Sequence, residues 1–220
     1  MINKSIKQVN LLKIAGENAQ EIYYGGIQKW YSSRWKRLSG CGPTVVSTIM
    51  NYYYRTCDND EAGDMPFPIA KFRKLMEDVW KYVTPTMRGI PNTDILLKGA
   101  QSYISAKNLD INLDFLDVHE TPRSRPEFGI LVEYLSDAFE HDMPVAFLNL
   151  NSGSEMLLDS WHWVTMISLE YEKDYSAAFI EFIDEGKITK INLLSWFKTT
   201  TLGGGFVSFH RYPESEKAND

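Results

Sequence analysis

Cys41 is the residue whose type and setting most favour chemistry. It lies in Ser39-Gly40-Cys41-Gly42-Pro43-Thr44, directly before an apolar stretch, residues 45–54, that predicts one helix opened by Pro43. A thiol at the first turn of a helix faces unpaired backbone N–H groups and the positive end of the helix dipole, and both favour the thiolate. Because the thiolate attacks carbonyl carbon, we predict that Cys41 is a nucleophile. The alternative is a buried cysteine that behaves as a small hydrophobic residue.

His162 is the best candidate for a base beside that thiol. It lies in Trp161-His162-Trp163-Val164, near the start of a predicted strand. An imidazole there could take the proton from Cys41 and later protonate a leaving amine. The alternative is a core histidine satisfied by a backbone carbonyl. The other histidines are weaker candidates, because His119 and His141 fall at the ends of elements and His210 has no polar neighbour of obvious use.

Asp184 is the candidate that would orient the imidazole. It ends the next predicted strand, twenty-two positions after His162, where an antiparallel return brings it back beside the histidine. A carboxylate there accepts the second imidazole N–H, fixes the tautomer and stabilises the cation. Alternatively, Asp184 is ordinary turn chemistry, since residues 184–187 read Asp-Glu-Gly-Lys and predict a hairpin turn.

The elements that must position these residues change in kind along the chain. Helical periodicity predicts helices over 43–54, 69–83, 92–107 and 129–141, with a short helix at 193–200. Strands are predicted over 111–117, 143–150, 161–171, 176–183, 188–192 and 206–212, whereas residues 1–20 predict a short helix or an arm. Helices therefore dominate the first half and strands the second, which indicates an α+β fold. We predict a single domain, 1–220, with a mainly helical lobe (1–110) and a mainly β lobe (111–220).

The ordered motifs around Cys41, His162 and Asp184 resemble those of the papain-like cysteine peptidases. Within that superfamily they are most similar to the bacteriocin-leader-processing peptidases and their stand-alone relatives. The resemblance implies a papain-like α+β fold, in which a central helix of the helical N-terminal half carries the nucleophile and packs against a C-terminal antiparallel sheet. It also implies a glutamine upstream of the nucleophile that stabilises an oxyanion, for which Gln28 is the best match and Gln20 the alternative.

Charge and composition narrow the partners. The net charge of −6 and the pI near 5.3 oppose binding to nucleic acid and to anionic membranes. Residues 29–37 interleave cations with aromatics and could stack on bases or contact an acidic peptide, but they could equally form a solvated loop near the cleft. We expect no metal and no cofactor, because the acidic segment 58–64 departs from a calcium loop, with Ala62 at a ligand position and Ile69 where the bidentate glutamate should be.

The spacing of the two cysteines and the hydropathy of the chain bear on its cellular compartment. Cys41 and Cys57 are separated by a largely helical segment, about 24 Å at ~1.5 Å per residue, so a disulfide between them is not expected. No run of eighteen apolar residues occurs, and residues 1–20 lack the apolar core of a signal peptide. We therefore expect a cytoplasmic protein that has no membrane partner.

These observations lead to one principal hypothesis and two alternatives. The principal hypothesis is a cysteine-dependent hydrolase that cleaves an amide or peptide bond through a thioester, with a peptide or a small amide as its substrate. The first alternative is an acyltransferase that uses the same residues, because an amine can resolve a thioester as water does. The second is a non-catalytic peptide-binding member of the fold. The oligomeric state is left open by the sequence.

Overall fold

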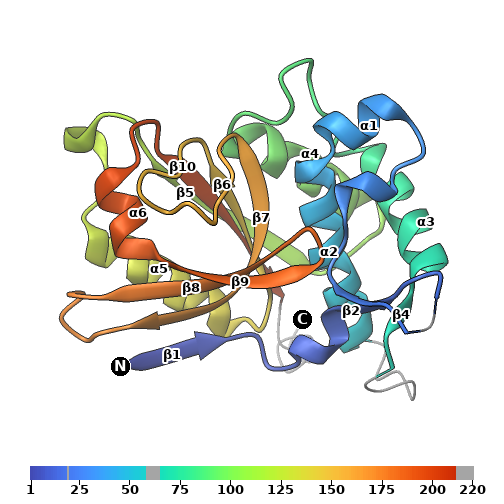
Figure 1. The fold of residues 1–220 in the computed structure, drawn as a ribbon, viewed down its shortest axis with the longest axis horizontal. Coiled ribbons are helices and arrows are strands. Elements are labelled where there is room, and N and C mark those ends of the chain that lie inside the picture. The colour runs from blue at the N-terminus through green and yellow to red at the C-terminus, as the bar shows by residue number, and fades with distance from the viewer. Residues whose placement is uncertain (19, 58–64, 212–220) are drawn as a thin grey trace, which may run out of the picture.

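The computed structural model describes residues 1–18, 20–57 and 65–211, so the acidic segment 58–64 lies outside the described residues. Over the described part of the chain the fold is α+β, with six α-helices and a large antiparallel sheet, which confirms the predicted class. In Figure 1 helices α1 to α4 gather on one side of the molecule and the large sheet fills the other. The bounds of the helices are α1 (Arg34–Ser39), α2 (Cys41–Cys57), α3 (Ile69–Trp80), α4 (Thr93–Ala106), α5 (Phe128–Glu140) and α6 (Leu193–Thr199).

The large sheet has the strand order β5-β10-β6-β7-β8-β9, and every pairing in it is antiparallel. Strand β7 is its centre, because β6 pairs with its first half and β1 with its second half along one edge, while β8 occupies the other edge. The bounds of the strands are β1 (Ile2–Ser5), β5 (Ile111–Val118), β6 (Val145–Asn149), β7 (His162–Tyr171), β8 (Ala178–Asp184), β9 (Lys187–Asn192) and β10 (Gly204–Arg211).

Helix α2 joins the helical elements to the sheet. It buries a stripe of apolar side chains, of which Val46, Ile49 and Met50 are fully buried, and it contacts β6 and β7. All five residues of β6 are buried, as are residues 163–169 of β7, so both faces of these central strands are covered. Burying such a stripe stabilises the helix by about 1.5–3 kcal/mol per large side chain. This packing fixes the position of Cys41, the first residue of α2, relative to the sheet.

The N-terminal region differs from the prediction of a short helix or an arm. Strand β1 extends the large sheet, a 3-10 helix follows at Val9–Leu12, and β2 (Lys13–Ala15) pairs with β3 (Ile22–Tyr24) and β4 (Phe67–Pro68) in a second, small sheet. These strands have four residues or fewer, which is too short for an alternating pattern to stand out in the sequence. The N-terminus thus contributes to the sheet that dominates the second half of the chain.

Residues 29–37 also differ from the predicted solvated loop. A 3-10 helix (Gln28–Trp30) is followed by α1, and Ser33 caps α1 by accepting a hydrogen bond from the backbone N–H of Lys36 at 3.2 Å. A serine in this position satisfies one of the free N–H groups at a helix start. The aromatic and basic residues of this segment are therefore held on short helices.

Two further observations concern the thiols and the membrane. Cys41 and Cys57 are both free thiols, at the first and last residues of α2. Among the helices of the described residues, none combines the length and the apolar character needed to span a bilayer.

Candidate active site

Cys41 is the first residue of α2, so the helix begins two residues earlier than the predicted start at Pro43. Gly40 separates α1 from α2, and a side-chain carbon there would lie 2.7 Å from the ring of Tyr31. Only glycine therefore fits the tight junction between the two helices. The junction leaves the half-buried Cys41 at the N-terminus of α2, where backbone N–H groups have no partner within the helix.

His162 and Asp184 come together at one end of the sheet. His162 is the first residue of β7 and Asp184 the last residue of β8, and His162 Nε2 lies 2.8 Å from Asp184 Oδ1. Both side chains are largely buried, with 19% and 23% of their surface exposed. Because Asp184 occupies Nε2, the other ring nitrogen, Nδ1, is the one available to Cys41, and His162 is close enough to the thiol for each group to shift the pKa of the other. The structure thus joins the three predicted residues in one chain of contacts.

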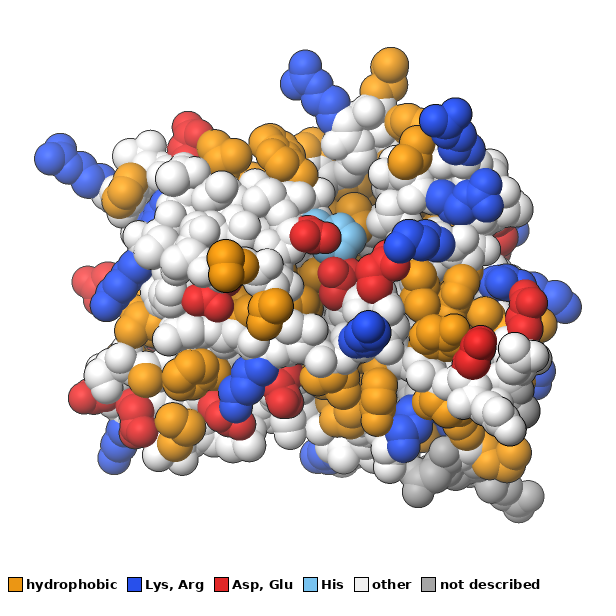
Figure 2. Space-filling view, viewed as in Figure 1, with side chains coloured by type: hydrophobic (Ala, Val, Ile, Leu, Met, Phe, Trp, Pro, Cys, Tyr) orange, Lys and Arg blue, Asp and Glu red, His pale blue; other side chains and the backbone are white. Residues whose placement is uncertain are grey.

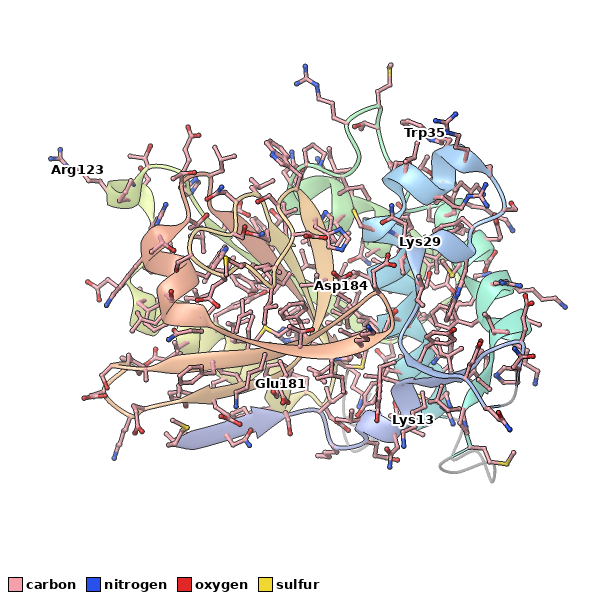
Figure 3. All side chains as sticks on the ribbon, viewed as in Figure 1. Lys13, Lys29, Trp35, Arg123, Glu181 and Asp184 are labelled. Carbon is pink, nitrogen blue, oxygen red and sulfur yellow. The ribbon has the colours of Figure 1, made fainter. Side chains whose placement is uncertain are left out.

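The β8–β9 hairpin holds Asp184 in place. Glu185 and Gly186 both have positive φ, 43° and 79°, and Asp184 pairs with Lys187 across this two-residue turn. Asp184 Oδ1 also accepts the backbone N–H of Glu185 at 3.0 Å. Figure 3 shows Asp184 at the tip of the hairpin, which reaches toward the segment that carries Lys29. A Lys29–Glu185 ion pair of 2.8 Å links the two segments.

Electrostatics at this site favour an ion pair between sulfur and imidazole. Burial alone would raise the pKa of Cys41, but the hydrogen bond and charge of His162, together with the backbone N–H groups of Trp163 and Gly42, lower it below its ordinary value. Burial lowers the pKa of His162, yet the hydrogen bonds and negative charges of Asp184 and Cys41 outweigh it and raise that pKa to about 10. Both shifts favour a thiolate beside an imidazolium over a neutral thiol beside a neutral imidazole.

Gln28 lies beside the three candidate catalytic residues. With Cys41, His162 and Asp184 it lines a narrow cavity of about 20 Å³, and its side chain is half-buried. Its Nε2 donates to the backbone oxygen of Arg37 at 2.7 Å, which uses one of the two amide hydrogens and leaves the other for a ligand. Gln20, the alternative, is exposed in the turn before β3 and does not line this cavity.

A second, wider cleft of about 280 Å³ also has Cys41 in its lining. Its lining is mostly apolar and includes Trp35, Leu38, Met87, Ile90, Leu150 and Trp161. Four of these side chains are exposed large hydrophobic residues, namely Trp35, Leu38, Met87 and Trp161. Figure 2 shows a hollow at the centre of this face, where orange side chains lie near a histidine and several acidic groups. Such a cleft suits an apolar ligand that extends past the thiol.

The sequence predicted the candidate residues that the structure brings together, but it gave no sign of most of this cleft. Residues 87–91 belong to a region whose role the motifs did not define, and they form one wall. Trp35 lies in the basic aromatic segment that predicted either a loop or a binding surface, and Trp161 precedes His162 with a positive φ of 57°. Positive φ is uncommon for a bulky residue, and nothing in the sequence marks Trp161 as having it.

Comparison with known proteins identifies the fold. No family model and no curated protein matches the chain. Among solved structures, the chain is similar to UfSP from C. elegans, a cysteine protease with a papain-like fold, with a TM-score of 0.51 and 11% sequence identity. The similarity covers 96% of this chain but only 34% of UfSP, so the chain spans about a third of the length of that relative. The α+β fold is accordingly similar to a papain-like fold.

Proposed function

We propose that this protein is a cysteine-dependent hydrolase that cleaves an amide or peptide bond through a thioester on Cys41. The observation that supports the proposal best is the position of His162 between the Cys41 thiol and the Asp184 carboxylate. A buried histidine with only a structural role has no need of a thiol on one nitrogen and a carboxylate on the other. The likeness in fold to a cysteine protease agrees with this reading.

The first half of the proposed reaction forms the thioester. The Cys41 thiolate attacks the carbonyl carbon, and the electron pair of the C=O bond moves to oxygen. The developing oxyanion accepts hydrogen bonds from backbone N–H groups at the start of α2 and from the free amide hydrogen of Gln28. When the tetrahedral intermediate collapses, the C–N bond breaks and His162 donates its Nδ1 proton to the leaving amine.

The second half regenerates the enzyme. His162, now neutral, takes a proton from water, and the resulting hydroxide attacks the thioester carbon. The C–S bond breaks, the acid product leaves, and Cys41 and His162 return to the thiolate–imidazolium pair. Asp184 accepts the Nε2 hydrogen throughout, so it keeps the ring oriented with Nδ1 toward the sulfur.

The substrate class follows from the wider cleft. Its apolar walls and its open form favour a peptide with a bulky apolar residue beside the scissile bond over a small polar amide. The finer relation to leader-processing peptidases and a cytoplasmic location are part of the same proposal. Their support is the order of the motifs along the chain and the two free thiols.

Mass spectrometry of a peptide library tests the proposal. We expect the wild-type chain to release fragments from peptides with apolar residues, and Cys41→Ala to release none. Identical products from the two proteins would overturn the proposal. Peptides that bind to both proteins but stay intact would instead support a non-catalytic binding module.

A parallel incubation with added amines separates hydrolysis from acyl transfer, since both reactions pass through the same thioester. Free acids as the main product at millimolar amine support hydrolysis. Amide products in proportion to the amine identify the chain as an acyltransferase.

A further inference from the structure

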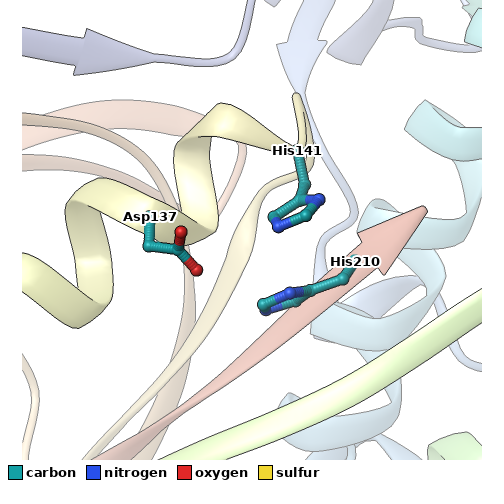
Figure 4. A group of neighbouring side chains, drawn as sticks. All are labelled: Asp137, His141 and His210. Carbon is teal, nitrogen blue, oxygen red and sulfur yellow. The ribbon is translucent and has the colours of Figure 1, made fainter. Parts of the chain in front are cut away.

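A group of three metal-ligating side chains lies apart from the elements that carry the proposed active site. Asp137 lies on α5 and His141 directly follows its last residue, whereas His210 lies on β10. One ligand atom from each residue lies within 4.8 Å of those of the other two. In Figure 4 the three side chains are directed into the same space between helix and strand. We propose that Asp137, His141 and His210 form a binding site for a zinc ion.

The backbone brings these three residues together without distortion. Asp137 and His141 are four residues apart, a spacing that places two side chains on the same face of a helix. Helix α5 contacts β10, and the rings of His141 and His210 are in contact, with centroids 4.2 Å apart and planes inclined by 31°. The ligands therefore come from two elements that packing already holds against each other.

Ser208 orients His210 as a metal ligand. Its Oγ lies 2.7 Å from His210 Nε2, accepts the Tyr134 hydroxyl hydrogen at 2.9 Å, and donates to the backbone oxygen of Asp114 at 3.4 Å. In the tautomer that carries its hydrogen on Nε2, His210 donates to Ser208 and keeps the lone pair of Nδ1 free for a metal ion. Histidine ligands of metal ions generally donate their other N–H to a neighbour in this way.

The donor set selects the metal. Two imidazole nitrogens and one carboxylate oxygen suit Zn²⁺, which often takes three protein ligands and a water molecule, whereas Ca²⁺ and Mg²⁺ prefer oxygen alone. With bonds of about 2.1 Å, ligand atoms at the corners of a tetrahedron lie about 3.4 Å apart. The observed 4.8 Å limit therefore requires a small closure, which the exposed carboxylate of Asp137 can make by rotation. Its exposed side also leaves room for the water.

The site would serve the fold rather than the reaction. Cys41, His162 and Asp184 lie on α2, β7 and β8, whereas the proposed zinc ligands lie on α5, directly after its last residue, and on β10. A zinc ion would clamp β10, the last strand of the described chain, to α5. We therefore expect zinc to raise the midpoint of thermal unfolding and to leave the chemistry at Cys41 to its own residues.

Zinc titration of the Cys41→Ser variant tests the proposal. That background removes the one thiol that could bind zinc together with His162 and Asp184. Calorimetry with zinc chloride is expected to give one ion per chain, and a hundredfold excess over Kd to raise the unfolding midpoint by about 5–10 °C. Adding His210→Ala should abolish binding, and adding Asp137→Asn should weaken it at least about tenfold. His119→Ala, which removes an exposed histidine elsewhere, should change neither quantity.

Two results would overturn the proposal. One is that the Cys41→Ser protein takes up no stoichiometric zinc at about 100 µM, a concentration well above the Kd of a structural site. The other is that its His210→Ala and Asp137→Asn derivatives bind zinc as the parent does. Should His210→Ala fail to fold, Asp137→Asn still decides the question, because that side chain is exposed.

Discussion

Replacing Asp184 with asparagine is expected to lower the pKa of His162. The carboxylate lies 2.8 Å from Nε2, and its hydrogen bond and charge help to raise the pKa of His162 to about 10 despite burial. Two unit charges about 4 Å apart interact by about 4 kcal/mol at an effective dielectric constant of 20. Partial exposure of both side chains reduces this energy, and asparagine retains a hydrogen bond. We therefore expect a fall of about 1–2 pKa units.

A lower pKa of His162 should narrow the pH range of activity from its alkaline side. In the wild-type protein we expect the thiolate–imidazolium pair from the lowered pKa of Cys41 up to about pH 10, the pKa of His162. In Asp184→Asn the upper limit moves to about pH 8–9, so the alkaline decline of hydrolysis begins at lower pH. The acidic limb, which reports Cys41, should move less.

NMR titration of the imidazole signals measures this pKa directly. The His162 signal is identified by its loss in His162→Gln. Glu185→Gln is the matched control, because it removes the neighbouring carboxylate, which pairs with Lys29 instead. An unchanged His162 pKa in Asp184→Asn would refute the reasoning, as would an equal fall in Glu185→Gln.

Three further substitutions probe the oxyanion, the cleft and the hairpin. Gln28→Ala should lower kcat about 100-fold without changing the alkylation of Cys41, while Gln20→Ala changes neither; equal kcat values in steady-state kinetics would remove Gln28 from the scheme. Trp161→Ala should raise KM about tenfold for peptides with a bulky apolar residue, and an unchanged KM would mean that such residues bind elsewhere. Gly186→Ala and Gly89→Ala should each lower the free energy of unfolding by about 1–2 kcal/mol, because both positions have a positive φ. Only at Gly186 would the added side-chain carbon contact a neighbour, Tyr23, at 2.8 Å. Urea unfolding should therefore show a greater decrease in the free energy of unfolding for Gly186→Ala than for Gly89→Ala, and equal decreases would contradict that contact.

The sequence singled out the candidate residues because the signals that mark them are local. A cysteine at a helix start and a histidine at a strand start are visible as short motifs, and the hairpin signal at residues 184–187 fixed the return of the strand. The concentration of predicted helices in the first half and of strands in the second likewise indicated the α+β class. Only the contact between Cys41 and His162 depended on tertiary structure, and the resemblance to a known family supplied that expectation.

The parts that could not be predicted depend on contacts between distant segments. Strand β1 is defined by its pairing with β7, more than 160 residues later, and not by a pattern of its own. The apolar cleft combines α1, residues 87–91 and Trp161, none of which carries a common motif. His210 acquires His141 as a neighbour only when β10 packs beside α5.

The central claim is that Cys41 and His162 share a thiolate–imidazolium pair, and the rate of Cys41 alkylation at acidic pH tests it most directly. An ordinary thiol of pKa ~8.5 is only about 0.3% thiolate at pH 6. Cys57, exposed at the other end of α2, provides an internal comparison in the same sample. With iodoacetamide at pH 6, we predict that Cys41 reacts at least about tenfold faster than Cys57, and that His162→Gln abolishes the difference. Equal rates for the two thiols in the wild-type protein would contradict the account.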